Sequence, residues 1–201
     1  MEQIQNNRVI TDLYRENAQF PGIALDGSDV YLCWQRFVDR HDSLMASCRR
    51  GDEVVWEREI SDGGEVLHPV ILAHGGAIWY AWSEYARENW RILARCYRDG
   101  QWGEVLTVAS GEALFFPRLF TWQGRLHIIW TEQHKGSAAA VLCPLTEAGP
   151  GAAETVSVVG EAYRAGAAEG GDGNLYVAYD GFDGKQYKLF ARARTAAGWS
   201  E

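Results

Sequence analysis

The apolar residues of the chain fall in short runs that are separated by turns and recur along the sequence. The first set of runs is Val30 to Trp34, Ile78 to Trp82, Leu126 to Trp130 and Leu175 to Tyr179. A second set follows at Ser43 to Arg50, Arg91 to Arg98, Ala138 to Leu145 and Lys188 to Thr195. Runs of this length, rich in aromatic and β-branched residues and bounded by glycine-containing turns, predict β-strands.

The runs repeat at a fixed interval of 48 residues. Pro21, Pro69 and Pro117 keep this interval, as do Trp34, Trp82 and Trp130, and after one inserted residue Tyr179 takes the fourth aromatic place. Each unit reads as a strand that begins near the proline, an aromatic strand, a third strand and a turn through Trp56, Trp102 or Trp199 into a fourth. Four strands in 40 to 50 residues are typical of a propeller blade, and the short runs exclude a helical solenoid.

The two ends of the chain complement each other. Val9-Ile10-Thr11 lies ten residues before Pro21, as Val105-Leu106-Thr107 lies ten before Pro117. The sequence therefore predicts one all-β domain, a four-bladed β-propeller with blades at about 20–66, 67–114, 115–162 and 163–201, in which a strand at 7–13 completes the last blade and closes the ring. Half of an eight-bladed dimeric ring and a fragment of a larger propeller are the alternatives. We expect a monomer, because closure within one chain avoids the entropy cost of association.

Composition agrees with this class. The 201 residues include 22 Gly, 9 Trp and 9 Tyr, the hydrophobic fraction is 47%, and the formal net charge is −8. Scattered basic residues on an acidic chain argue against nucleic acid as a partner. No apolar run is long enough for a membrane span, and residues 1–18 lack the apolar core of a signal peptide, so we expect a cytoplasmic location, or an extracellular one if a leader has been removed.

The turn before the fourth strand carries fragments of a known motif. Arg98-Asp99-Gly100-Gln101-Trp102 keeps an Asp, a Gly and a Trp in compressed spacing, Gly51 to Trp56 keeps Gly and Trp, and Gly198-Trp199 keeps the last pair. This pattern resembles the Asp-box (BNR) repeats of the sialidase-like propeller superfamily, and the blade count resembles hemopexin-like propellers. The resemblance implies an arginine triad and acidic catalytic groups, but no residue of this chain matches them. Arg118 follows Pro117 in the reverse of the sialidase order, so an ordinary strand-edge arginine is the simpler interpretation.

Cysteine and histidine spacing does not indicate a metal site. Cys33, Cys48, Cys96 and Cys143 include no Cys-x-x-Cys pair, and equivalent positions in neighbouring blades lie too far apart for a disulfide, so we expect four free, buried thiols. His41, His68, His74, His127 and His134 show no ligand spacing. We therefore predict no metal and no cofactor, apart from an unspecific ion that a central channel can hold.

The candidate site lies where the second strand of each blade ends. Its predicted residues are Trp34, Arg36, Trp82, Glu84, Trp130, Glu132, Tyr179 and Asp180. The loops that follow are polar with interleaved aromatics, and in a propeller they share a face with the residues that precede the prolines, Phe20, His68 and Phe116. The competing interpretation is that the Trp and Tyr side chains pack blade against blade while Glu84 and Glu132 bond to turn amides.

Two functions fit this site. The first is a non-catalytic module that binds a glycan, a peptide or a partner protein through one face of the propeller. The alternative is a glycosidase-type hydrolase with Glu84 and Glu132 as its paired carboxylates. Carboxylate spacing distinguishes them, because retaining glycosidases need about 5–5.5 Å and inverting ones about 6.5–9.5 Å.

Overall fold

The structure, a computed structural model, describes residues 17–61 and 63–200. Its regular elements are all β-strands, and this part of the chain contains no helix that could span a membrane. The predicted closing strand at 7–13 lies outside the described residues.

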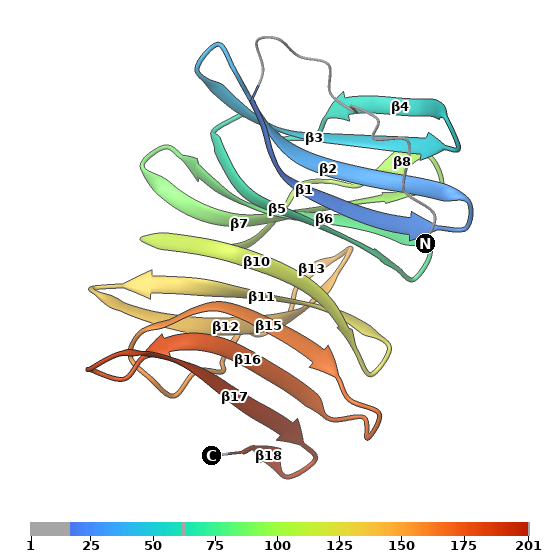
Figure 1. The fold of residues 1–201 in the computed structure, drawn as a ribbon. Coiled ribbons are helices and arrows are strands. Elements are labelled where there is room, and N and C mark those ends of the chain that lie inside the picture. The colour runs from blue at the N-terminus through green and yellow to red at the C-terminus, as the bar shows by residue number, and fades with distance from the viewer. Residues whose placement is uncertain (1–16, 62, 201) are drawn as a thin grey trace, which may run out of the picture.

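The strands form four antiparallel sheets, which are the four blades (Figure 1). The first sheet has β1 (Asn17–Asp26), β2 (Asp29–Val38), β3 (His41–Arg50) and β4 (Glu53–Glu59). The second has β5 (Glu65–His74), β6 (Ala77–Ala86), β7 (Asn89–Arg98), β8 (Gln101–Trp102) and β9 (Leu106–Gly111). The third has β10 (Ala113–Trp122), β11 (Arg125–His134), β12 (Ser137–Thr146), β13 (Gly149–Pro150) and β14 (Glu154–Thr155). The fourth has β15 (Ala162–Glu169), β16 (Leu175–Phe182), β17 (Tyr187–Thr195) and β18 (Gly198–Trp199). This confirms the all-β, four-bladed prediction.

The blades are held together by apolar layers between neighbouring sheets. Trp82 lies in the layer between the first and second sheets, Trp130 in the layer between the second and third, and Tyr179 in the layer between the third and fourth. All three side chains are almost fully buried. Burying a large apolar side chain contributes roughly 1.5–3 kcal/mol, so these repeated aromatic positions account for much of the stability of the interfaces.

The four blades form a row with two separate ends. The first strands of the blades stack on one another, β1 on β5, β5 on β10 and β10 on β15. Figure 1 shows the first and fourth sheets at opposite ends of this row. Within the described residues, therefore, one face of the first sheet and one face of the fourth sheet have no neighbouring blade.

Candidate functional site

The first strand of every blade contains a bulge at the same repeat position. Phe20, His68, Phe116 and Arg164 have φ values of 52°, 53°, 56° and 46°. In each blade the register with the second strand shifts across this residue. A positive φ is unfavourable for residues with a side chain, and such strain, of order 1–3 kcal/mol per residue, is concentrated at functional sites.

The bulges bring side chains from successive blades into contact. The ring centroids of Phe20 and His68 are 5.3 Å apart, and those of His68 and Phe116 are 4.4 Å apart. Successive residues of this set are 48 positions apart and lie on the first strands of three consecutive blades. Because their rings are in contact, these first strands converge here towards a common axis. We call Phe20, His68 and Phe116 the axial cluster.

Further rings extend the axial cluster to one side. Phe115 lies 6.5 Å from His68, and Trp90 of β7 lies 4.6 Å from Phe115, measured between ring centroids. Tyr85 of β6 lies 5.3 Å from Trp90. These three rings are partly buried and Phe20 is exposed, so the molecule presents a continuous aromatic surface that crosses from the first to the third blade.

Polar groups accompany this surface. Nδ1 of His68 is buried and has no hydrogen-bond partner among the described residues. Burial lowers the pKa of His68, and the positive charge of Arg118 lowers it further, so the neutral form of the ring is favoured. Arg118 is exposed, and no carboxylate in the described part of the chain pairs with it.

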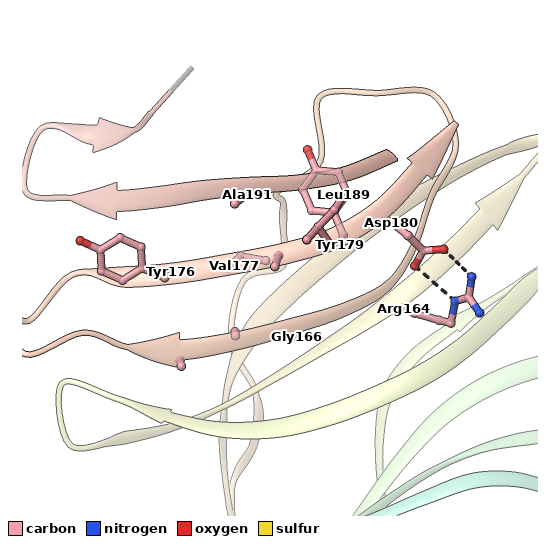
Figure 2. A pocket seen from close by; sticks show the side chains of 11 residues that line it. Arg164, Gly166, Tyr176, Val177, Tyr179, Asp180, Leu189 and Ala191 are labelled. Carbon is pink, nitrogen blue, oxygen red and sulfur yellow. Dashed lines mark hydrogen bonds and ion pairs between the residues drawn. The ribbon is translucent and has the colours of Figure 1, made fainter. Parts of the chain in front are cut away.

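The fourth bulge residue differs from the other three. Nε and Nη2 of Arg164 donate to the two carboxylate oxygens of Asp180 at 3.2 and 2.5 Å (Figure 2). These hydrogen bonds raise the pKa of the guanidinium. Arg164 is therefore engaged with its own blade, and the aromatic part of the surface belongs to the first three blades.

The charged residues predicted for the site all lie near the bulges. In the ladder between first and second strands, Arg36 is opposite Ala18 and Glu84 is opposite Val66. Glu132 is opposite Leu114, and Asp180 is opposite Tyr163. The structure thus places Arg36, Glu84, Glu132 and Asp180 at the same end of their blades, but each is held by different partners.

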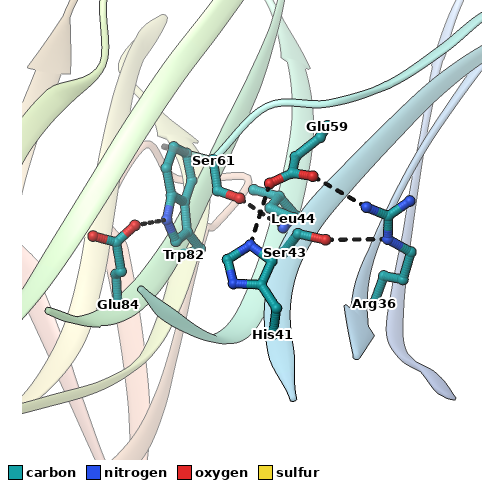
Figure 3. Close-up of polar contacts among 8 residues, drawn as sticks. All are labelled: Arg36, His41, Ser43, Leu44, Glu59, Ser61, Trp82 and Glu84. Carbon is teal, nitrogen blue, oxygen red and sulfur yellow. Dashed lines mark hydrogen bonds and ion pairs between the residues drawn. The ribbon is translucent and has the colours of Figure 1, made fainter. Parts of the chain in front are cut away.

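Arg36 is occupied by contacts within the first sheet. Its Nη2 donates to Oε2 of Glu59 at 3.1 Å, and its Nε donates to the hydroxyl of Ser43 at 3.2 Å (Figure 3). His41 lies 3.7 Å from the other carboxylate oxygen of Glu59. Arg36 therefore fixes β2 to β3 and β4.

The side chain of Glu84 is buried, and each of its two carboxylate oxygens accepts a hydrogen bond. Arg91 donates to its Oε1 through Nη2. The indole N–H of Trp82 donates to its Oε2 at 3.4 Å (Figure 3). Gly64 packs against it so closely that a Cβ there would lie 2.9 Å from Cγ of Glu84, and the φ of Gly64 is +107°. The carboxylate of Glu84 is therefore part of the packed interior of the second blade.

Glu132 is more open than Glu84 and lies in a different hollow. It lines a hollow of about 530 Å³ together with His134, Lys135 and other residues of the third blade. Glu84 lines a separate hollow of about 480 Å³ on the second blade. Neither of these two hollows contains both carboxylates.

The predicted aromatic residues lie beneath this end of the blades. Trp82, Trp130 and Tyr179 fill the layers between sheets, as the blade-packing interpretation expects. Trp34 is also buried. The hydroxyl of Tyr179 accepts the backbone N–H of Val158 at 3.2 Å, whereas Nε1 of Trp34 and Nε1 of Trp130 have no hydrogen-bond partner in the part of the chain that the structure describes.

The cysteines and the other residue types that bind metal ions form no second site in the described part of the chain. All four cysteines are free and buried, as the sequence predicted. Burial raises the pKa of Cys33 to about 12 and that of Cys143 to about 11. Within the described ranges no group of three or more His, Cys, Asp or Glu side chains could hold a metal ion.

Comparison with known proteins shows a likeness of fold alone. The sequence matches no protein-family model and no curated protein. A protein of unknown function from Dyadobacter fermentans aligns with a TM-score of 0.68 at 13% identity, over 94% of this chain and 71% of that one. An endo-arabinase from Bacteroides thetaiotaomicron aligns with a TM-score of 0.58 at 12% identity, over 90% and 78%. A xylan β-1,4-xylosidase from Bacillus halodurans aligns with a TM-score of 0.54 at 14% identity, and this chain spans only 41% of its length. The chain thus has a propeller-type fold that glycoside hydrolases also use.

Proposed function

We propose that the protein binds a carbohydrate at the axial cluster and does not hydrolyse it. The observation that carries this proposal is the direct ring-to-ring contact of Phe20, His68 and Phe116 at three strained backbone positions. The rings of aromatic residues offer flat apolar faces with negative potential, which suit the C–H face of a sugar ring. A few polar groups beside such a surface fix the orientation of a ligand.

Two groups beside the rings suit sugar hydroxyls. Nδ1 of His68 is buried and unpartnered, so a sugar hydroxyl can reach it only if a neighbouring side chain moves aside; that hydrogen bond would remove the cost of a buried polar atom without a partner. The guanidinium of Arg118 can donate to ring or hydroxyl oxygens. None of the four bulge residues is a carboxylate, which supports binding over catalysis at this position.

Hydrolysis of a glycosidic bond is the second candidate function, and the fold shared with xylosidase and arabinase structures favours it. On this hypothesis Glu132 is the accessible carboxylate, and Glu84 would have to leave Arg91 and Trp82 to take part. A sialidase-like relationship remains a hypothesis that rests on the Asp-box fragments.

Titration calorimetry with arabino- and xylo-oligosaccharides tests the binding proposal. We expect Phe20→Ala and Phe116→Ala to weaken binding at least tenfold, equivalent to about 1.4 kcal/mol. Phe37→Ala is the matched control, because Phe37 is 43% exposed, as Phe20 is, and has no ring contact among the described residues. Equal affinity in all three variants would contradict the proposal.

An assay for reducing sugar released from the same oligosaccharides tests the second candidate. Binding without release supports the non-catalytic module. Release that Glu132→Gln abolishes would instead establish the hydrolase.

A further inference from the structure

The second blade holds a carboxylate between an arginine and a tryptophan. Glu84 on β6 lies opposite Arg91 on β7 in the ladder, and Nη2 of Arg91 donates to its Oε1. The indole N–H of Trp82 donates to its Oε2 at 3.4 Å. The guanidinium and the indole together therefore satisfy both oxygens of a buried carboxylate.

The third blade keeps two members of this set and lacks the third. Trp130 and Glu132 occupy the repeat positions of the tryptophan and the carboxylate, but Ala139 lies opposite Glu132, where the second blade has Arg91. Among the described residues, no side chain forms a hydrogen bond or an ion pair with the carboxylate of Glu132. Nε1 of Trp130 is buried and also has no partner in this part of the chain. The third blade thus has the carboxylate and the indole without the guanidinium that joins them in the second blade.

The hollow beside Glu132 is the repeat of the hollow beside Glu84. Their walls share four repeat positions, which are Glu84, Arg91, Leu93 and Thr107 in the second blade and Glu132, Ala139, Val141 and Thr155 in the third. Because alanine replaces arginine, Glu132 is half-buried at the wall of a hollow of about 530 Å³. A carboxylate that is partly withdrawn from water and has no protein partner favours a cation beside it.

Two further charged or titratable side chains line this hollow, His134 and Lys135. Nδ1 of His134 lies 3.2 Å from Oε2 of Glu112, and the same oxygen accepts the backbone N–H of Lys135 at 3.2 Å. The ring of His134 is therefore directed to Glu112. The side chain of Lys135 is exposed and forms no ion pair with any described residue, so it is the one cation of the chain that could compete for Glu132.

We propose that the hollow beside Glu132 binds the guanidinium group of a ligand, either a small molecule such as free arginine or an arginine side chain in a peptide. The ligand would supply the group that Arg91 supplies in the second blade. A guanidinium suits this place because its planar set of N–H donors matches the two oxygens of a carboxylate. The site is separate from the axial cluster, so the proposal does not depend on carbohydrate binding.

An NMR titration that follows the backbone amide signals tests the proposal at low ionic strength, where screening is weak. L-arginine should bind, and L-citrulline, which has a similar shape without the charge, should bind at least tenfold more weakly. Glu132→Gln should weaken arginine binding at least tenfold. Glu65→Gln is the matched control, because Glu65 is exposed and lines neither of the two hollows, and it should bind arginine like the wild type. A blocked Gly-Arg-Gly peptide run in parallel distinguishes the two sources, since tighter binding than free arginine indicates a peptide.

A second variant supplies the missing group from the chain itself. Ala139→Arg should abolish arginine binding and have a higher melting temperature than Ala139→Met, and this difference should disappear when Glu132→Gln is added. Equal melting temperatures of the two variants would contradict a guanidinium site at Glu132. No binding of arginine to the wild type, equal binding of citrulline, or unchanged binding in Glu132→Gln would each overturn the proposal. Binding that appears only in Lys135→Ala would also overturn it, because Lys135 would then be the partner of Glu132.

Discussion

His68 and Phe116 lie 48 residues apart in the sequence, and their ring centroids are 4.4 Å apart in the structure. Both residues precede a proline, and both have a left-handed backbone in the first strand of a blade. One repeat position therefore determines both how the strands bend and which side chains meet at the axis.

The left-handed backbone at Phe20 makes stability depend on the side chain. Asn tolerates a positive φ, whereas a β-branched residue does not. We expect Phe20→Val to have a free energy of unfolding about 1–2 kcal/mol lower than Phe20→Asn, measured by urea denaturation. Equal stability of the two variants would show that the bulge relaxes at no cost.

The buried carboxylate of Glu84 should be structural. Glu84→Gln removes the charge opposite Arg91, and we expect a loss of roughly 1–3 kcal/mol in the free energy of unfolding. Glu132→Gln is the control and should change it by less than about 0.5 kcal/mol. In a double-mutant cycle, Arg91→Gln should cost less in the Glu84→Gln background than in the wild type. Additive effects would contradict direct coupling of Glu84 and Arg91.

The cysteines should titrate as four free thiols in denatured protein without reductant, which a chromogenic thiol reagent can count. The native protein should react much more slowly at pH 8, because burial raises the pKa of all four thiols and the thiolate is the reactive form. Fast reaction of native protein would show that the interfaces between blades open readily.

We expect His68 to lower the free energy of unfolding in mildly acidic solution. Burial lowers its pKa in the folded state, so below an unfolded pKa of about 6.5 the unfolded chain takes up a proton that the folded chain resists. The free energy of unfolding should therefore decrease as pH falls from 7 towards 5, and this decrease should be smaller in His68→Gln. His127, whose pKa burial also lowers, adds a dependence of the same sign that the variant retains. An identical pH dependence in both proteins would contradict a desolvated His68.

The sequence predicted the blades because packing demands recur in every repeat. Trp34, Trp82, Trp130 and Tyr179 occur where each sheet needs a large apolar side chain, so the interval alone locates the second strands. The bulges were missed as site residues, although Phe20, His68 and Phe116 were expected on the same face. A residue before proline favours extended backbone, so nothing in the sequence indicated a positive φ.

The charged site residues show a second limit of sequence analysis. Glu84 and Glu132 occupy equivalent positions, yet only Glu84 has an Arg91 across the ladder and a Gly64 packed against it. Burial depends on such neighbours, which a repeat pattern does not specify. In the same way, Leu189 continues the apolar pattern of Ile92 and Ala140, but the pattern cannot show whether another blade covers it.

A crystal structure of the protein soaked with an arabino- or xylo-oligosaccharide tests the central claim most directly. The account predicts electron density for a sugar ring against Phe20, His68 and Phe116, with a hydroxyl within hydrogen-bond distance of the guanidinium of Arg118. Sugar bound instead in the hollow beside Glu132, with the axial cluster empty, would contradict it.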